Sequence, residues 1–187
     1  MKYLKNFKMY VALMAMSVAF VSCDKEGDAN GDNSKPLVAT QCSYSLTVAV
    51  ADGAEDQNSV MSTVVSYPNY DGAMTTKNIS FATEWNSTLS SPITTLPVEG
   101  VITIVRNVKE GVDLSAKEEY KVGIRYKLYV YSMDAEESVV KYDIKQEEFN
   151  EVVPAENMPL MYPETITLKF TVDAQGEVTI VEVQDEE

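Results

Sequence analysis

The chain has 187 residues, of which 29 are acidic and 15 are basic, for a formal net charge of −14. It contains no histidine, which excludes Ser-His-Asp and Cys-His nucleophile systems and every metal site that depends on imidazole. The acidity also argues against a nucleic-acid partner, because the phosphates of DNA and RNA bind Lys and Arg.

The first 22 residues have the layout of a secretory signal peptide. They hold three lysines, no acidic residue and an apolar run at 9–21, which is shorter than the roughly 20 residues of a membrane-spanning helix. The run ends in Phe20-Val21-Ser22-Cys23, which resembles a bacterial lipobox with Phe20 in place of the usual Leu. The resemblance implies that residues 1–22 are removed and that Cys23 is lipidated, so that its acyl chains hold the protein to a membrane. A plain secretory signal with an incidental cysteine is the alternative.

Residues 23–36 predict a flexible acidic tether, because they offer little apolar surface for packing. The acids that follow Cys23 resemble the export signal of Bacteroidota surface lipoproteins, which implies a lipid anchor in the outer membrane and exposure on the cell surface. In enterobacterial lipoproteins an aspartate in the position of Asp24 would instead imply retention in the inner membrane. Which membrane holds the protein therefore depends on the organism that makes it. Without residues 1–22 the chain keeps all 29 acids but only 12 basic residues, so its net charge becomes more negative.

The tether also contains a partial calcium-loop pattern. Asp28, Asn30 and Asp32 alternate like the first three ligands of an EF-hand loop. Asn33 then stands where the turn glycine belongs, and Ala39 stands where the bidentate glutamate belongs. We interpret the segment as a solvated linker and expect neither a metal site nor a cofactor.

From Leu37 onward, apolar residues recur with a period of two, which is typical of strands. The pattern predicts strands at 44–50, 60–67, 79–85, 98–108, 120–130, 139–146, 166–172 and 178–183. No window of ten residues favours an amphipathic helix. The sequence therefore predicts one all-β domain over 37–187, a single antiparallel, immunoglobulin-like β-sandwich of about eight strands that ends in a C-terminal hairpin.

Alternation along the predicted strands indicates which side chains face the core. The even-numbered residues of 120–130 are expected to face inward, and so are Val140, Tyr142 and Ile144 of the following strand. The third strand is expected to place Ile79, Phe81, Thr83 and Trp85 on one face. In the last strand the phase slips between Ile180 and Val181, which predicts a β-bulge.

One local pattern resembles fibronectin type III and related immunoglobulin-like domains. In those domains a leucine stands six residues before the tyrosine of a tyrosine corner, as Leu114 stands before Tyr120. The resemblance implies that the Tyr120 hydroxyl donates a hydrogen bond back to the turn while its ring fills the core. Type III domains usually carry a tryptophan in their second strand, whereas Trp85 lies in the predicted third strand, so the resemblance leaves the exact topology open.

Cys42 is expected to occupy a half-buried strand position. With Cys23 lipidated, it has no intrachain partner for a disulfide. No histidine or basic neighbour in the sequence would lower the pKa of its thiol, so we expect no nucleophilic or redox role.

The residues that bear on function are acids and tyrosines. The pairs Glu118-Glu119, Glu136-Glu137 and Glu147-Glu148 fall in predicted turns or strand ends, where acids are usually solvated, so we do not expect an enzyme. Tyr70 lies in a turn, and Tyr129 and Tyr131 lie at the parity opposite the core face. Exposed tyrosines can stack on sugars or anchor a protein contact, although they can also cover a second layer or stand singly on the surface.

Three functions follow from this reading. The first is a lipid-anchored surface protein that acts as a binding or accessory module for a glycan or protein partner. The second is a structural subunit of a surface assembly, similar to the fimbrillins of Bacteroidota, that adds a strand to a neighbour's sheet. Many fimbrillins are cleaved after an arginine near the N-terminus, whereas Arg106 and Arg125 lie inside predicted strands. The third is a carboxylate-based glycoside hydrolase. The oligomeric state stays open.

Overall fold

The computed structural model describes residues 37–69, 71–79, 85–88 and 95–183. These residues belong to the compact unit Pro36–Glu187. The predicted signal peptide, the predicted lipidation site Cys23, the predicted tether and Tyr70 lie outside the described residues. None of the described helices is long and apolar enough to span a membrane.

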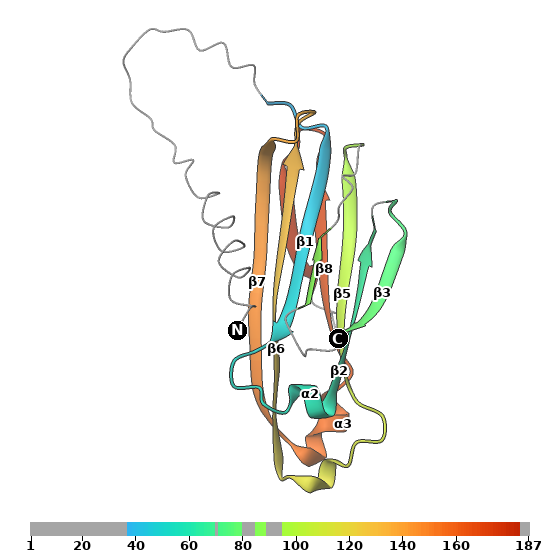
Figure 1. Cartoon of the computed structure of the whole chain (residues 1–187), viewed down its shortest axis with the longest axis vertical. Helices are drawn as coiled ribbons and strands as arrows, with labels where there is room; N and C mark the ends of the chain where they lie inside the picture. Colours follow the sequence, from blue (N-terminus) through green and yellow to red (C-terminus); the bar gives the residue numbers. More distant parts are fainter. Residues whose placement is uncertain (1–36, 70, 80–84, 89–94, 184–187) are drawn as a thin grey trace, which may run out of the picture. The chain divides into compact units, whose positions relative to one another are not determined.

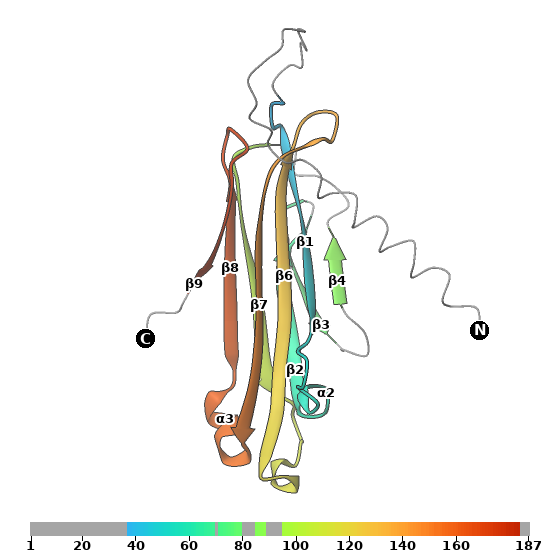
Figure 2. The ribbon, with the colours of Figure 1, turned by 90° about the vertical axis from the view of Figure 1, so that its left-hand side faces the viewer.

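The described residues form two antiparallel sheets, as the two-residue period predicts (Figures 1 and 2). One sheet has four strands in the order β4 (Trp85–Thr88), β1 (Gln41–Val50), β6 (Glu119–Met133) and β7 (Val139–Pro154). The other has five strands in the order β3 (Met74–Ile79), β2 (Met61–Pro68), β5 (Val98–Val108), β8 (Glu164–Val172) and β9 (Val178–Val183). Every strand pairing is antiparallel, which confirms the predicted all-β sandwich.

Helical structure in the described residues is limited to short turns. These are α2 (Gln57–Val60), α3 (Met158–Met161) and the 3-10 turns η1 (Leu114–Ala116) and η2 (Ala155–Asn157). All four lie toward the end of the sandwich at which β2 and β6 begin (Figure 1).

The main core lies between the sheets and draws on the inward faces of both. On β6 the even-numbered residues from Tyr120 to Val130 are all buried, as their alternation predicts. Leu46 of β1 and Leu168 of β8 join the same cluster from the two sheets. Gly100 of β5 also faces this core, where a Cβ would lie 2.1 Å from the ring of Phe170, so only glycine fits beside that ring.

A second buried cluster fills the end that holds the short helices. Its buried members are Val60, Met61, Tyr120, Val122, Val153, Met158 and Tyr162. β6 contributes to both clusters, because its first inward residues belong to the second cluster and its later ones belong to the main core.

Three details differ from the sequence predictions, and the first concerns the predicted third strand. Ile79 ends β3 in the five-stranded sheet, whereas Trp85 begins β4 in the four-stranded sheet. The two residues therefore belong to different strands. The two sheets together contain nine strands in the described residues, against about eight predicted.

The second difference is the phase of β7. The pairing of β6 with β7 shifts at Ser132 and Met133, which pair with Lys141 and Val139, so Val140 is one extra residue on β7. One extra residue moves every following side chain to the opposite face of the sheet. Tyr142 and Ile144, predicted to face inward, are therefore 63% and 42% exposed.

The third difference lies in the last strand. β8 and β9 pair without a register shift from Val172–Val178 to Thr167–Val183, so the predicted bulge between Ile180 and Val181 is wrong. β9 carries apolar residues on both faces, and it lies at the edge of the sheet. Ile180 packs against the main core, whereas Val181, on the opposite face, is exposed.

Candidate functional site: a tyrosine patch on the four-stranded sheet

Three tyrosines gather on the outward face of the four-stranded sheet. Tyr129 and Tyr131 of β6 stack with ring centroids 5.0 Å apart, and Tyr142 of β7 meets Tyr129 edge-on at 5.6 Å. We call Tyr129, Tyr131 and Tyr142 the tyrosine patch. Sequence reasoning identified the first two members and missed the third.

Strand pairing explains how the patch forms. Tyr131 lies directly opposite Tyr142 in the pairing of β6 with β7, and cross-strand partners share a face. Tyr129 and Tyr131 are two residues apart on one strand and therefore project from the same side. The extra residue on β7 is what places Tyr142 on this side, and no residue in that segment signals a bulge.

The neighbours of the patch are mainly uncharged. On β1, Ser43 lies opposite Tyr131 and Ser45 lies opposite Tyr129. On β7, Ile144 lies opposite Tyr129. Burial is the main cause that raises the pKa of Tyr129, and the neighbouring Tyr131 and Tyr142 raise it further. The rings are therefore held against one another rather than standing singly on the surface.

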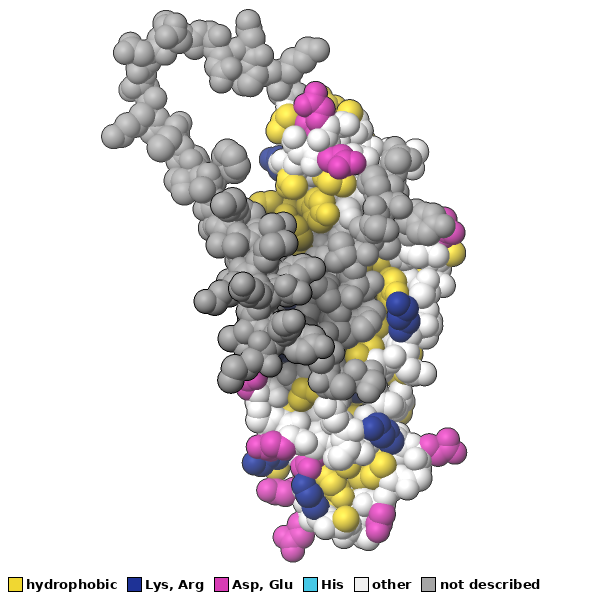
Figure 3. All heavy atoms as spheres, viewed as in Figure 1, with side chains coloured by type: hydrophobic (Ala, Val, Ile, Leu, Met, Phe, Trp, Pro, Cys, Tyr) yellow, Lys and Arg dark blue, Asp and Glu magenta, His cyan; other side chains and the backbone are white. Residues whose placement is uncertain are grey.

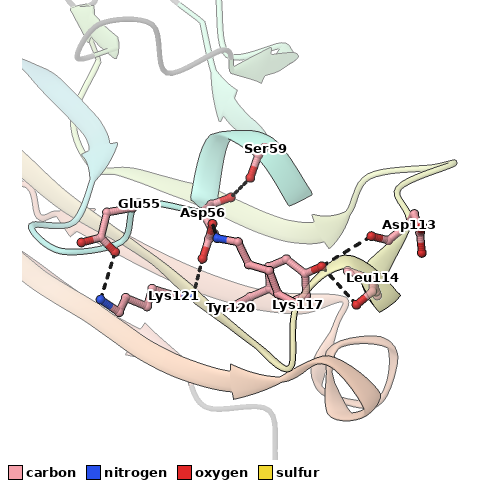
Figure 4. Close-up of polar contacts among 8 residues, drawn as sticks. All are labelled: Glu55, Asp56, Ser59, Asp113, Leu114, Lys117, Tyr120 and Lys121. Carbon is pink, nitrogen blue, oxygen red and sulfur yellow. Dashed lines mark hydrogen bonds and ion pairs between the residues drawn. The ribbon is translucent and has the colours of Figure 1, made fainter.

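A second arrangement, at the end of the sandwich that holds α2, is structural (Figure 4). The Tyr120 hydroxyl donates to the backbone carbonyl of Leu114 at 3.1 Å, the bond that the tyrosine-corner pattern predicts. A longer contact of 3.4 Å reaches the carbonyl of Asp113. The ring of Tyr120 is buried in the second cluster, against which Leu114 packs.

Asp56 connects the segment before α2 to this corner. Its carboxylate accepts a hydrogen bond from the Lys121 backbone N–H at 3.0 Å and forms an ion pair with Lys117. Lys121 also pairs with Glu55 at 3.4 Å. Acidic and basic side chains lie side by side at this end of the molecule in Figure 3.

The acid pairs that the sequence offers for catalysis lie on the surface. Glu118 and Glu119 precede or begin β6, and Glu136 and Glu137 lie in the turn before β7. Glu147 and Glu148 lie within β7, and not at a strand end as the sequence suggested. All six side chains are exposed. No group of three Cys, Asp or Glu side chains in the described ranges is arranged to hold a metal ion.

Cys42 and Trp85 complete the candidate residues. Cys42 is 1% exposed and faces the main core, so it is fully buried and not half-buried as predicted. Burial raises the pKa of its thiol to about 11.

Trp85 begins β4, where its backbone pairs with Val48 of β1. Tyr70, the third predicted binding tyrosine, lies outside the described residues.

Comparison of the chain with protein-family models, with curated proteins and with solved structures gave no match. Any statement about function therefore depends on the chemistry of the residues described above.

Proposed function

We propose that this protein is a non-enzymatic, lipid-anchored cell-surface module that binds a glycan or protein partner through the tyrosine patch. The observation that carries the proposal is the gathering of three tyrosine rings on one outward sheet face, with Tyr142 63% exposed. Tyrosine is enriched at binding surfaces because its ring buries large apolar area while its hydroxyl forms hydrogen bonds.

The position of the patch supports a role in binding. All three rings project from the paired strands β6 and β7, so little conformational entropy is lost when a ligand settles on them. Ile144 extends the exposed apolar surface beside Tyr129. A contiguous exposed apolar area of this kind favours an interaction site over scattered surface residues.

The proposed anchor is carried by the N-terminal sequence. The lipobox-like ending at Cys23 and the acids that follow it support lipidation and display on the outer membrane. In cells expressing the full chain, Cys23→Ser should abolish incorporation of labelled palmitate and release the protein from the membrane fraction. Retention of the label would contradict the anchor.

The binding role is tested with the full-length lipoprotein on intact cells. A triple variant, Tyr129→Ala, Tyr131→Ala and Tyr142→Ala, should lose most binding to a glycan array or to crosslinked surface partners. The matched control is Val101→Ala with Val181→Ala, two exposed apolar residues on the five-stranded sheet. Equal binding by the triple variant and the wild type would reject the patch as the site. Release of reducing ends from a bound glycan would favour the hydrolase alternative.

A structural subunit remains the second candidate because β3 is an edge strand with mostly exposed side chains. Such an edge can accept a strand from another chain. Maturation by cleavage after arginine is disfavoured, since Arg106 lies in β5 with a fully buried side chain and Arg125 lies within β6. Polymers that form after protease treatment of the purified lipoprotein would support this candidate over the binding module.

A further inference from the structure

Outward-facing side chains form rows across the four-stranded sheet, and these rows differ in charge. One row joins Ser43, Tyr131 and Tyr142, and the next joins Ser45, Tyr129 and Ile144. Ser43 is buried, so the surface that a ligand can reach in these rows is formed by Ser45, Ile144 and the three tyrosines. Both rows consist of hydroxyl, aromatic and aliphatic groups without an ionisable acid or amine. From these rows we infer that the ligand of the tyrosine patch is the flank of an extended, uncharged polysaccharide, an inference that rests on the proposed function.

The chemistry of a sugar matches both kinds of group in these rows. A pyranose ring presents C–H groups on its faces, which pack on an aromatic ring, and hydroxyls at its rim, which exchange hydrogen bonds with Ser, Thr and Tyr. Tyr142 offers the most exposed ring of the patch, and the phenol hydroxyls and the half-buried Ser45 hydroxyl lie within the same two rows.

Strand geometry favours the side of a long chain over a chain end. Neighbouring strands lie about 4.8 Å apart, and alternate residues on one strand lie about 6.7 Å apart, so the patch is a shallow array on a sheet surface. The ring-centroid separations of 5.0 Å between Tyr129 and Tyr131 and of 5.6 Å between Tyr129 and Tyr142 agree with such an array. An array on a sheet can accept successive sugar units along one chain, whereas an enclosed pocket would select its terminus.

The net charge of the chain, rather than the few charges beside the patch, argues against an anionic polymer. The next row holds Thr47, Lys127 and Gln146, and only Lys127 is charged. In the row beyond, Arg125 forms an ion pair with Asp52 at 3.2 Å. The net charge of the chain is −14, and a field of that sign repels uronate or sulfate groups at low salt.

The size of the apolar area favours a glycan over a protein. A stable protein interface buries about 800 Å² on each side around a desolvated centre. The apolar area here consists of the exposed Tyr142 and Ile144 and the half-buried Tyr129 and Tyr131, and the half-buried Ser45 of β1 borders it. A protein partner is therefore an outcome that the experiment must be able to detect.

The experiment uses the full-length lipoprotein in detergent micelles and native affinity electrophoresis. The gels contain neutral probes (a mixed-linkage glucan, a xylan, a mannan and starch) or anionic probes (polygalacturonate and alginate). We expect retardation by at least one neutral polysaccharide that persists in 0.5 M NaCl. Tyr142→Ala should weaken it about five- to tenfold, whereas Tyr142→Phe should weaken it less and Val101→Ala with Val181→Ala should leave it unchanged.

The outcomes separate this inference from the proposed function. Retardation by only the anionic probes, or by none of the panel, overturns the inference. If a crosslinked protein partner is lost in the triple tyrosine variant while no neutral probe binds, the binding patch stands and the glycan assignment fails. If a neutral probe binds equally to the wild type and to Tyr142→Ala, the patch itself is wrong.

Discussion

The tyrosine corner depends on a single hydroxyl. Tyr120→Phe keeps the buried ring and removes the donor to the Leu114 carbonyl. We expect the free energy of unfolding to fall by about 1 kcal/mol, the usual net worth of such a hydrogen bond. Urea denaturation measures it, with Tyr142→Phe as the control because that ring is exposed. Equal midpoints for Tyr120→Phe and the wild type would show that the corner does not stabilise the fold.

Asp56 makes part of the stability depend on pH. The hydrogen bond from Lys117 is the largest of the causes that lower the pKa of Asp56, the Lys121 N–H and the nearby positive charges also lower it, and burial opposes them. The folded pKa therefore lies below the ordinary value of 3.8. The stabilising contribution is complete above the unfolded value and is lost as the pH falls through the lower folded value.

We therefore expect the free energy of unfolding of the wild type to decrease more steeply than that of Asp56→Asn when the pH falls from about 5 to about 2. Denaturant titrations at a series of pH values measure this difference. Glu136→Gln, at an exposed acid in a turn, is the matched control and should follow the wild type. Parallel curves for Asp56→Asn and the wild type would show that Asp56 does not contribute to the pH dependence of stability.

At the scale of the element, alternation predicted most strands and their faces, but it gave the wrong phase for β7 and ended it too early. The strand carries apolar side chains at both parities, with Tyr142, Ile144 and Val152 at one and Phe149 and Val153 at the other. The apolar residues at 140, 142 and 144 favoured the wrong phase, and Phe149 and Val153, at the opposite parity, lie beyond the predicted strand 139–146. The extra residue at Val140 sets the phase of β7, and one of the three members of the tyrosine patch, Tyr142, depends on it.

β5 shows a similar limit. Its sequence predicted a strand at 98–108, and that strand lies between β2 and β8. Its alternation, however, continues the inward face from Ile102 and Ile104 to Arg106, a charged residue that hydrophobic patterning would not place in a core. Arg106 is tolerated there because it donates to Glu164 at 2.5 Å and to the Tyr162 hydroxyl at 3.1 Å.

This buried ion pair predicts an unequal response to substitution. Glu164→Leu leaves the fully buried guanidinium without its carboxylate and should cost about 3 to 5 kcal/mol of unfolding free energy. Arg106→Met should cost less, because it removes the buried charge and its Nε, which has no hydrogen-bond partner among the described residues. The Glu164 carboxylate that remains is 33% exposed and can be hydrated. Urea denaturation of both variants measures the order, and the reverse order would contradict this account.

At the scale of the whole described unit, side chains join the two sheets along the β7 and β9 edges. Asp143 of β7 accepts a hydrogen bond from the Ile180 N–H at 2.9 Å, and Lys145 pairs with Glu182 at 3.3 Å. The Tyr126 hydroxyl also donates to Glu182 at 2.9 Å. In the observed phase of β7, the charged side chains Asp143 and Lys145 face inward, and both have partners on β9. These partners explain how β7, an edge strand with few apolar inward residues, is accommodated.

The two buried clusters should unfold together, because β6 runs through both and β5 extends from the main core to Val108 beside the second cluster. Leu168→Ala in the main core and Met158→Ala in the second cluster each remove a fully buried side chain. Each should cost about 2 to 5 kcal/mol. Both should shift one transition without splitting it, so that far-ultraviolet circular dichroism and tyrosine fluorescence give the same midpoint.

Amide hydrogen exchange tests the coupling between the two clusters residue by residue. Met158 belongs to the second cluster, whereas the slowest β8 amides belong to the main core. If the clusters are coupled, Met158→Ala and Leu168→Ala should speed the exchange of these amides equally for each kcal/mol of unfolding free energy that the variant loses. If Met158→Ala speeds exchange only around α3 and the start of β6, the end of the sandwich opens on its own. The continuity of β5 and β6 through both clusters would then be insufficient to make the domain one cooperative unit.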